Sequence, residues 1–216
     1  MKREKIVTIA EPDSQISESY KILRSILSFF NGNEEKKVIM LTSAHDDDEK
    51  TAVITNAAVS LAQSGKRILL VEGDYRNPML YDLFEVPKMP GLTNMVFEKK
   101  QLKDCVHDII GIKGLSVLTA GTSPVANLEL FARQEFLNAM EEMKTAYDMV
   151  LIDIPPVLKY SDGIVLSKYV DGVVLVAALG ISNKEQLVQS RDMLKMVDAQ
   201  ILGLVLTNSK KKKKEQ

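Results

Sequence analysis

The sequence predicts a single α/β domain in which a mostly parallel β-sheet is covered by helices on both faces. Short, almost continuously apolar segments alternate along the chain with longer segments of helical periodicity. Strands buried in a parallel sheet have this continuous apolar character, and the helices between them are the usual crossovers. With 216 residues and 45% hydrophobic residues, the chain is long enough for one domain with a sizeable core.

The N-terminal residues 1–35 are expected to form a distinct segment built around an amphipathic helix, Ser14–Phe30. Apolar side chains recur there every three or four residues, which places them on one helix face. They are Ile16, Tyr20, Leu23, Leu27 and Phe30.

Residues 36–209 are expected to form the α/β domain itself. The apolar runs predicted as strands are Val38–Leu41, Arg67–Val71, Leu115–Leu118, Met149–Ile152, Gly172–Ala177 and Ile201–Thr207. The segments predicted as helices are Thr51–Ser64, Asn127–Tyr147, Asp162–Tyr169 and Asn183–Val197. Met79–Lys113 is less regular and is expected to contain one or two short helices, with loops at Pro87–Gly91.

The segment Val38–Asn56 combines a strand, a loop that ends in Lys50-Thr51, and the start of a helix. This is the arrangement of a phosphate-binding loop, in which backbone N–H groups surround the phosphates, a lysine reaches the outer phosphates and a hydroxyl holds magnesium. The sequence therefore predicts a nucleotide-binding fold.

The same loop lacks the glycines that such loops place before the lysine, and it carries Asp46, Asp47, Asp48 and Glu49 instead. Carboxylates facing a polyanionic ligand repel it, by about 1 kcal/mol for a pair at ~4 Å in water and several-fold more near a protein surface. A bound divalent cation would offset part of this repulsion. The alternative is that these residues cap the following helix, whose dipole favours negative charge.

Two more strand ends carry charged residues. Glu72, Asp74 and Arg76 follow one apolar strand, and Asp153 ends another. Because parallel sheets bind ligands at the carboxyl ends of their strands, these side chains are candidates for a magnesium site beside the phosphate loop. The alternative is that Asp153 begins a turn and pairs with Arg76.

Charge and cysteine content narrow the functional classes. The chain has 28 Lys and Arg against 29 Asp and Glu, a net charge of −1, so charge gives no indication of a nucleic-acid partner. Cys105 is the only cysteine, which indicates a reducing compartment. The printed sequence shows no apolar signal segment and no stretch long enough to span a bilayer. We therefore expect a cytoplasmic protein.

The order of its motifs identifies the chain as resembling the bacterial tyrosine kinases encoded with capsule and exopolysaccharide genes, relatives of the partition and septum-site ATPases. The matching segments cover nearly the whole chain. They are Thr42-Ser43-Ala44 leading into Lys50-Thr51, LLVEGDYRNP, GLTNMV, TAGTSPVANLELF, YDMVLIDIPPV, the Asp162 segment, VDGVVLV and ILGLVLTN.

The resemblance implies ATP and Mg²⁺ as cofactors and assigns roles by matching position. Catalytic roles fall on Lys50, Asp74 and Asp153, and nucleotide binding on Ser43, Lys50, Thr51 and Arg76. The implied magnesium ligands are Thr51, Glu72, Asp74 and Asp153. Glu72 stands where the family has aspartate, and its extra methylene would shift a metal ligand by more than about 1 Å, which catalysis tolerates poorly.

The resemblance also implies an oligomer-forming surface on the early helix, where the family has a Glu-x-x-Arg-x-x-Arg pattern. Here the pattern reads Glu18, Lys21, Arg24, and lysine is a poorer bidentate partner for carboxylate than arginine. Homo-oligomers are therefore expected, with weakened contacts. The alternative is an ordinary solvated helix face.

The C-terminal residues 210–216 are expected to be a disordered lysine-rich tail, where the family usually has tyrosines that neighbouring subunits phosphorylate. The lysines could contact anionic lipid, but a solvated tail is the simpler interpretation.

Three functions remain open from the sequence. The first is a catalytically impaired regulator or scaffold of polysaccharide assembly, recruited to the inner face of the cell membrane by a membrane-embedded chain-length regulator. The second is an active ATP-dependent protein-tyrosine kinase. The third is a membrane-surface positioning ATPase, which the absence of an apolar face on the tail disfavours.

Overall fold

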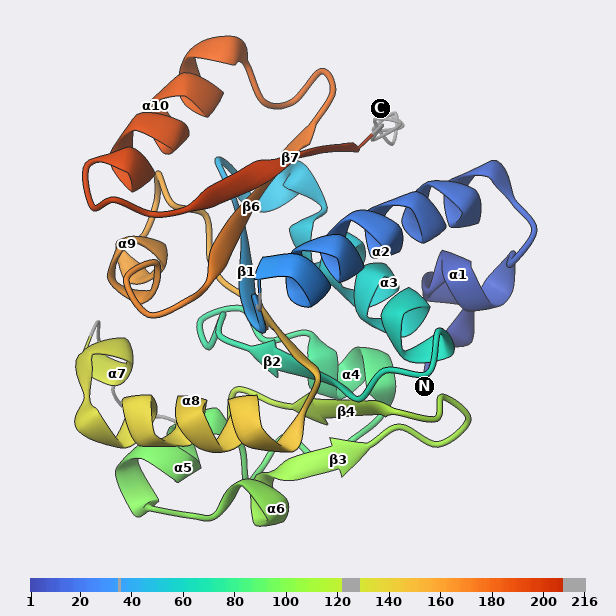
Figure 1. The fold of residues 1–216 in the computed structure, drawn as a ribbon, viewed down its shortest axis with the longest axis vertical. Helices are drawn as coiled ribbons and strands as arrows, with labels where there is room; N and C mark the ends of the chain where they lie inside the picture. Colours follow the sequence, from blue (N-terminus) through green and yellow to red (C-terminus); the bar gives the residue numbers. More distant parts are fainter. Residues whose placement is uncertain (35, 122–128, 208–216) are drawn as a thin grey trace, which may run out of the picture.

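The fold of the chain was obtained as a computed structural model, which describes residues 1–34, 36–121 and 129–207 (Figure 1). Seven strands in these residues form one sheet, in the order β3-β4-β2-β5-β1-β6-β7. Neighbouring strands are parallel, except that β3 is antiparallel to β4. The strands are β1 Val38–Ser43, β2 Ile68–Glu72, β3 Val106–Asp108, β4 Leu115–Leu118, β5 Met149–Asp153, β6 Gly172–Ala178 and β7 Ile201–Thr207.

The helices lie on both faces of the sheet, and those after α2 lie between strands in the chain. They are α1 Val7–Ala10, α2 Gln15–Glu34, α3 Lys50–Gln63, α4 Leu80–Phe84, α5 Leu92–Glu98, α6 Leu102–Cys105, α7 Glu129–Ala132, α8 Gln134–Ala146, α9 Asp162–Leu166 and α10 Lys184–Lys195. Two short 3₁₀ turns, η1 Arg3–Lys5 and η2 Asp46–Asp48, complete the described elements.

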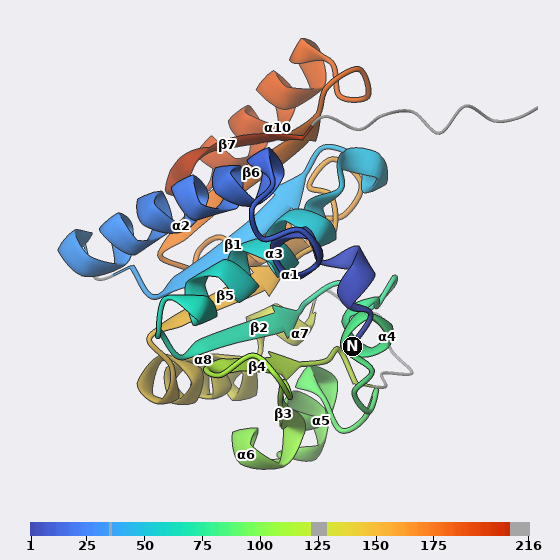
Figure 2. The ribbon, with the colours of Figure 1, turned by 90° about the vertical axis from the view of Figure 1, so that its right-hand side faces the viewer.

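Each face of the sheet has its own hydrophobic core, because successive side chains of a strand point to opposite faces. In β1, Ile39 belongs to the core that includes α3 and Leu27 of α2, whereas Met40 belongs to the core that includes α8. Helices α2 and α3 lie side by side over the first face, as Figure 2 shows. Helices α5, α7, α8, α9 and α10 contribute to the core of the other face.

The α/β class with a mostly parallel sheet is confirmed, and most predicted elements are present. The predicted helix Ser14–Phe30 is α2, whose Leu27 is buried in the core that it shares with α3. Prediction was less accurate where periodicity is short. A single helix was expected over Asn127–Tyr147, but the structure has two, α7 and α8, separated by the extended residue Arg133. The first two residues of the expected helix lie outside the described part of the chain. Strand β3 was not predicted.

None of the helices in the described residues is long and apolar enough to cross a membrane. The lysine-rich tail, residues 210–216, lies outside the described part of the chain.

Candidate nucleotide site

The loops that carry the three charged motifs meet at the carboxyl ends of β1, β2 and β5. These strands are neighbours in the sheet, and Asp153 at the end of β5 lies in register with Leu41 of β1 and Glu72 of β2. The Gly73 amide donates a hydrogen bond of 2.8 Å to the Asp153 carbonyl, which joins the second and third motifs. The sheet thus brings together segments that are far apart in the sequence.

Lys50 and Thr51 both bind the Asp153 carboxylate. The Lys50 ammonium pairs with Oδ1, and the Thr51 hydroxyl donates to Oδ2 over 2.7 Å. Lys50 and Asp153 are 5% and 2% exposed, so the pair is nearly closed to water. Both Lys50 and Thr51 lie at the N-terminus of α3, where the helix dipole favours an anion. The structure therefore brings together the lysine, hydroxyl and aspartate that the sequence predicted.

Glu49, directly before Lys50, has a left-handed backbone conformation with φ 59° and ψ 24°. Glycine adopts this conformation at no steric cost, whereas a side chain with a Cβ adopts it under strain. The loop thus has a backbone geometry that suits glycine, with an exposed glutamate in its place.

The acidic loop does not present all of its carboxylates to a ligand, and for Asp48 that expectation was wrong. Asp48 is fully buried and accepts hydrogen bonds from the His45 amide, the Ala178 amide and the Ser182 hydroxyl. It fixes the loop to the end of β6. The side chain of Asp47 lies outside the described part of the structure.

Asp46 also has a partner. Its Oδ2 lies 2.6 Å from the ammonium of Lys159, a residue of the loop between β5 and α9. The hydrogen bond with Asp46 raises the pKa of Lys159. Two of the four carboxylates of the loop are thus matched by donors elsewhere in the chain.

Glu72 is buried and turned toward the backbone. Its carboxylate accepts hydrogen bonds from the amides of Met79, Leu80 and Ala120, the last two over 2.6 and 3.1 Å. Burial raises the pKa of Glu72, while these three bonds oppose the increase. The side chain predicted as a magnesium ligand therefore holds the start of α4 and the end of the β4 segment.

Asp74 is half-buried beside the Lys50–Asp153 pair. Burial raises the pKa of Asp74, Lys50 lowers it, and the charge of Asp153 raises it again. One of its oxygens accepts a hydrogen bond of 3.2 Å from the Asn77 amide, which leaves the carboxylate available at the site.

Arg76 does not pair with Asp153, so that alternative is wrong in this structure. Its guanidinium donates to Asp162, which is fully buried, over 2.9 Å. The guanidinium also lies between two aromatic rings, 4.5 Å from the centroid of Tyr75 and 4.4 Å from that of Tyr160. Tyr75 donates a second hydrogen bond to Asp162 over 2.6 Å. Arg76 is held inside a cluster of side chains next to the site.

The remaining predicted residues have structural partners. Ser43 is buried, and its hydroxyl donates to the His45 carbonyl over 2.7 Å, within the loop. On α2, Glu18 and Lys21 form an exposed ion pair at 3.0 Å. Arg24 instead points to α3 and donates to the Ser60 carbonyl over 3.3 Å. Within one subunit, Glu18 and Lys21 therefore pair with each other, and Arg24 contacts α3 instead.

Sequence reasoning missed Lys159, Tyr160 and the buried position of Asp48. An acidic loop signals that a cation is needed, but the chain has 28 lysines and arginines. Only the folded structure selects Lys159, which is 113 residues from Asp46 in the sequence.

The side chains at the site fit magnesium. The Thr51 hydroxyl and the Asp153 and Asp74 carboxylates are hard oxygen donors, which Mg²⁺ prefers. In the described residues no group of three or more His, Cys, Asp and Glu could hold a metal ion by itself. In nucleotide sites Mg²⁺ is usually held by one or two carboxylates together with the phosphates.

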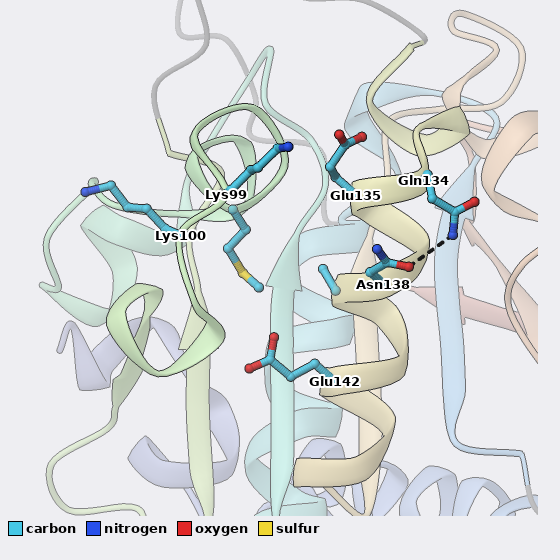
Figure 3. A pocket seen from close by; sticks show the side chains of 8 residues that line it. Lys99, Lys100, Gln134, Glu135, Asn138 and Glu142 are labelled. Carbon is cyan, nitrogen blue, oxygen red and sulfur yellow. Dashed lines mark hydrogen bonds between the residues drawn. The ribbon is translucent and has the colours of Figure 1, made fainter.

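A hollow lies away from the site, between the end of α5 and α8 (Figure 3). Lys99 and Lys100 line one side, and Glu135 and Glu142 line the other. These charges are of both signs, so the hollow does not select an anion. None of the predicted site residues belongs to it.

Comparison with known proteins agrees with this geometry. Residues 36–201 match the family described as the AAA domain. CapB of Staphylococcus aureus is 32% identical over 196 residues, which cover 91% of this chain and 86% of CapB. The tyrosine-protein kinase YwqD of Bacillus subtilis is 31% identical over 205 residues, which cover 95% of this chain and 86% of YwqD. The chain belongs to the bacterial capsule and exopolysaccharide tyrosine-kinase family.

Solved structures show the same fold. The kinase domain of the Escherichia coli tyrosine kinase ETK has a TM-score of 0.89 at 28% identity. The match covers 98% of this chain and 82% of the ETK chain. The chimaeric protein CapA2B2 has a TM-score of 0.89 at 29% identity, with coverages of 95% and 91%. The septum-site protein MinD of Pyrococcus horikoshii shares the fold alone, with a TM-score of 0.66 at 22% identity. The match covers 79% of this chain and 69% of the MinD chain.

Proposed function

We propose that this chain is a regulatory member of the capsule and exopolysaccharide kinase family, with weak binding of Mg-ATP and impaired transfer of phosphate to tyrosine. The observation that carries the proposal is Glu49. A carboxylate stands in a left-handed backbone position directly before Lys50, at the N-terminus of α3. At that point a phosphate loop needs close backbone approach and no negative charge.

The position of Glu72 supports the same conclusion. Its oxygens accept hydrogen bonds from three backbone amides, which compete with a metal ion for them. Asp153, Asp74 and Thr51 would then hold Mg²⁺ with the phosphates, and Lys50 would leave Asp153 to reach the outer phosphate. Because phosphoryl transfer depends mainly on positioning and charge neutralisation, a misplaced first carboxylate would slow the reaction.

A regulatory role requires a partner, and we propose a membrane-embedded chain-length regulator of the CapA type. The similarity to CapB and to the chimaera CapA2B2 supports this choice. The partner would recruit the chain from the cytoplasm to the inner face of the cell membrane. Self-association through α2, with Glu18 and Lys21 exposed for contact, belongs to the same proposal.

An active kinase is the second candidate, because Lys50 and Thr51 both contact Asp153 and the carboxylate of Asp48 is buried among its own donors. One experiment separates the two candidates. The purified chain is incubated with Mg-ATP and the cytoplasmic segment of the partner, and transfer of labelled phosphate to tyrosine is compared with that of Lys50→Met.

The regulatory proposal predicts no transfer by either protein, together with Mg-ATP affinity in the high micromolar range or weaker by calorimetry. Robust transfer that disappears in Lys50→Met would contradict it and establish the active kinase. ADP and magnesium-free titrations serve as controls for the contribution of the metal.

A further inference from the structure

The ion pair between Lys159 and Asp46 links two motif loops at the nucleotide site. Asp46 lies in the acidic loop after β1, and Lys159 lies six residues after Asp153, in the loop that leaves β5. The two groups are 2.6 Å apart. The acidic loop is therefore tied to the loop that continues from the aspartate of the third motif.

Lys159 belongs to an ordered chain of contacts, which distinguishes it from an ordinary surface lysine. Its ammonium lies 5.2 Å from the ring centroid of Tyr160, and the guanidinium of Arg76 lies 4.4 Å from the same ring. Arg76 is in turn bonded to the fully buried Asp162. Because exposed ion pairs lose much of their value to side-chain entropy, an ordered lysine is a more effective partner.

The charges of the loop define what Lys159 can do. Asp48 is buried with three donors, so its charge is already compensated inside the protein. Among the described carboxylates of the loop, Asp46 and Glu49 then remain exposed, at the point where a triphosphate would enter. A cation on Asp46 halves this exposed charge, and the gain is largest against a ligand that carries several negative charges.

We propose that Lys159 is a charge-compensating residue of the phosphate site: by remaining paired with Asp46 it lets the acidic loop accept the triphosphate of Mg-ATP. This extends the proposed function, because it rests on weak nucleotide binding by the same site. Lys159 acts through Asp46 and does not itself touch the phosphates.

The test is a double-mutant cycle on the full chain, with the dissociation constant of Mg-ATP as the readout. Lys159→Ala should weaken binding about five- to tenfold at low salt, because it exposes the Asp46 charge. Asp46→Asn alone should bind at least as tightly as the wild type. The double variant should recover wild-type affinity, and Lys159→Arg should retain it. Raising the salt concentration should reduce the effect of Lys159→Ala, since both groups are half-exposed.

Lys144→Ala is the matched control, because Lys144 pairs with Glu141 on α8 at 3.2 Å, near the residue where β5 begins and not where it ends. It should leave the dissociation constant unchanged. Circular dichroism melting of every variant reports whether the fold is intact.

Three results would overturn the proposal. They are an unchanged affinity in Lys159→Ala, a double variant as weak as Lys159→Ala with an intact fold, and a wild-type chain that binds no nucleotide. The second result would mean that Lys159 contacts the phosphates directly. The proposed function fails by different results, namely robust transfer of phosphate to tyrosine or tight Mg-ATP binding by the wild-type chain.

Discussion

Glu49 shows how one residue decides the chemistry of a loop. The loop reaches α3 through a left-handed residue whether or not that residue is glycine, because the buried elements on either side, β1 and α3, fix the two ends. The sequence therefore places strain and negative charge at the same point.

We expect Glu49→Gly to stabilise the protein by about 1 kcal/mol, since glycine removes the left-handed strain at a small entropic cost in the unfolded chain. Mg-ATP should also bind more tightly, because one carboxylate is lost from the loop. Urea unfolding and calorimetry measure the two effects.

Lys99→Gly is the control, since Lys99 ends α5 in the same left-handed conformation, φ 55°, away from the site. It should reproduce the gain in stability without the gain in affinity. Equal affinity for Mg-ATP in Glu49→Gly and the wild type would show that Glu49 is not what limits binding.

Asp74 gives a prediction for pH. Burial raises the pKa of Asp74 above that of the unfolded chain, so the folded protein binds the extra proton more strongly. The resulting contribution to stability is present below the ordinary aspartate pKa and is lost as pH rises through the raised value. Asp74→Asn should therefore reduce the fall in unfolding free energy across weakly acidic pH.

Asp82 provides the comparison of opposite sign, because Lys2 lowers its pKa by a hydrogen bond. Its contribution to stability is present above the ordinary aspartate pKa and is lost as pH falls. Asp82→Asn should therefore reduce the rise in unfolding free energy with increasing pH. Urea unfolding at a series of pH values measures both. An unchanged slope in Asp74→Asn would contradict the assignment.

At the scale of elements, the site depends on the close approach of β2 and β5 where both strands end. A Cβ on Gly73 would lie 2.5 Å from the Ile154 side chain and 2.9 Å from the Asp153 carbonyl. Glycine at this position thus allows the second and third motifs to share a hydrogen bond and places Asp74 beside Asp153.

Gly73→Ala should cost about 1–3 kcal/mol, because the strand ends must separate to admit the methyl group. It should also weaken Mg-ATP binding by displacing Asp74. Gly32→Ala in α2, where a Cβ would meet nothing within 4 Å, should be neutral or stabilising. Denaturant unfolding compares the two, and equal stabilities would exclude this packing argument.

At the scale of the whole molecule, the sheet has two different edges. The antiparallel strand β3 forms one edge, and the apolar strand β7 forms the other. Leu204 and Leu206 of β7 are 47% and 56% exposed, and the strand ILGLVLT carries no charge or proline. Such an edge is a site for unwanted strand pairing between molecules.

Leu206→Lys should therefore reduce aggregation at high protein concentration while changing the unfolding free energy by less than about 0.5 kcal/mol. Ile110→Lys is the control, because Ile110 is 93% exposed but lies outside the sheet. Light scattering over time measures both, and equal aggregation rates for the two variants would refute a role for the edge.

Sequence alone determined the fold class, most of the elements and the placement of the three charged motifs at the carboxyl ends of the strands. Near-continuous apolar strands and motif order are local properties, and parallel strands bring their carboxyl ends to one edge wherever the intervening chain runs. Lys50, Thr51 and Asp153 were predictable for this reason. The break between α7 and α8 and the short strand β3 were not, because segments of that length carry little periodic signal.

Only the tertiary structure decided which charges face the ligand. Asp48 and Asp46 are two residues apart in an acidic run, yet one is buried against β6 and the other pairs with Lys159. Likewise, Glu72 turns to backbone amides and Arg76 to Asp162. The direction of each side chain depends on donors from distant segments, and these become neighbours only when the sheet assembles.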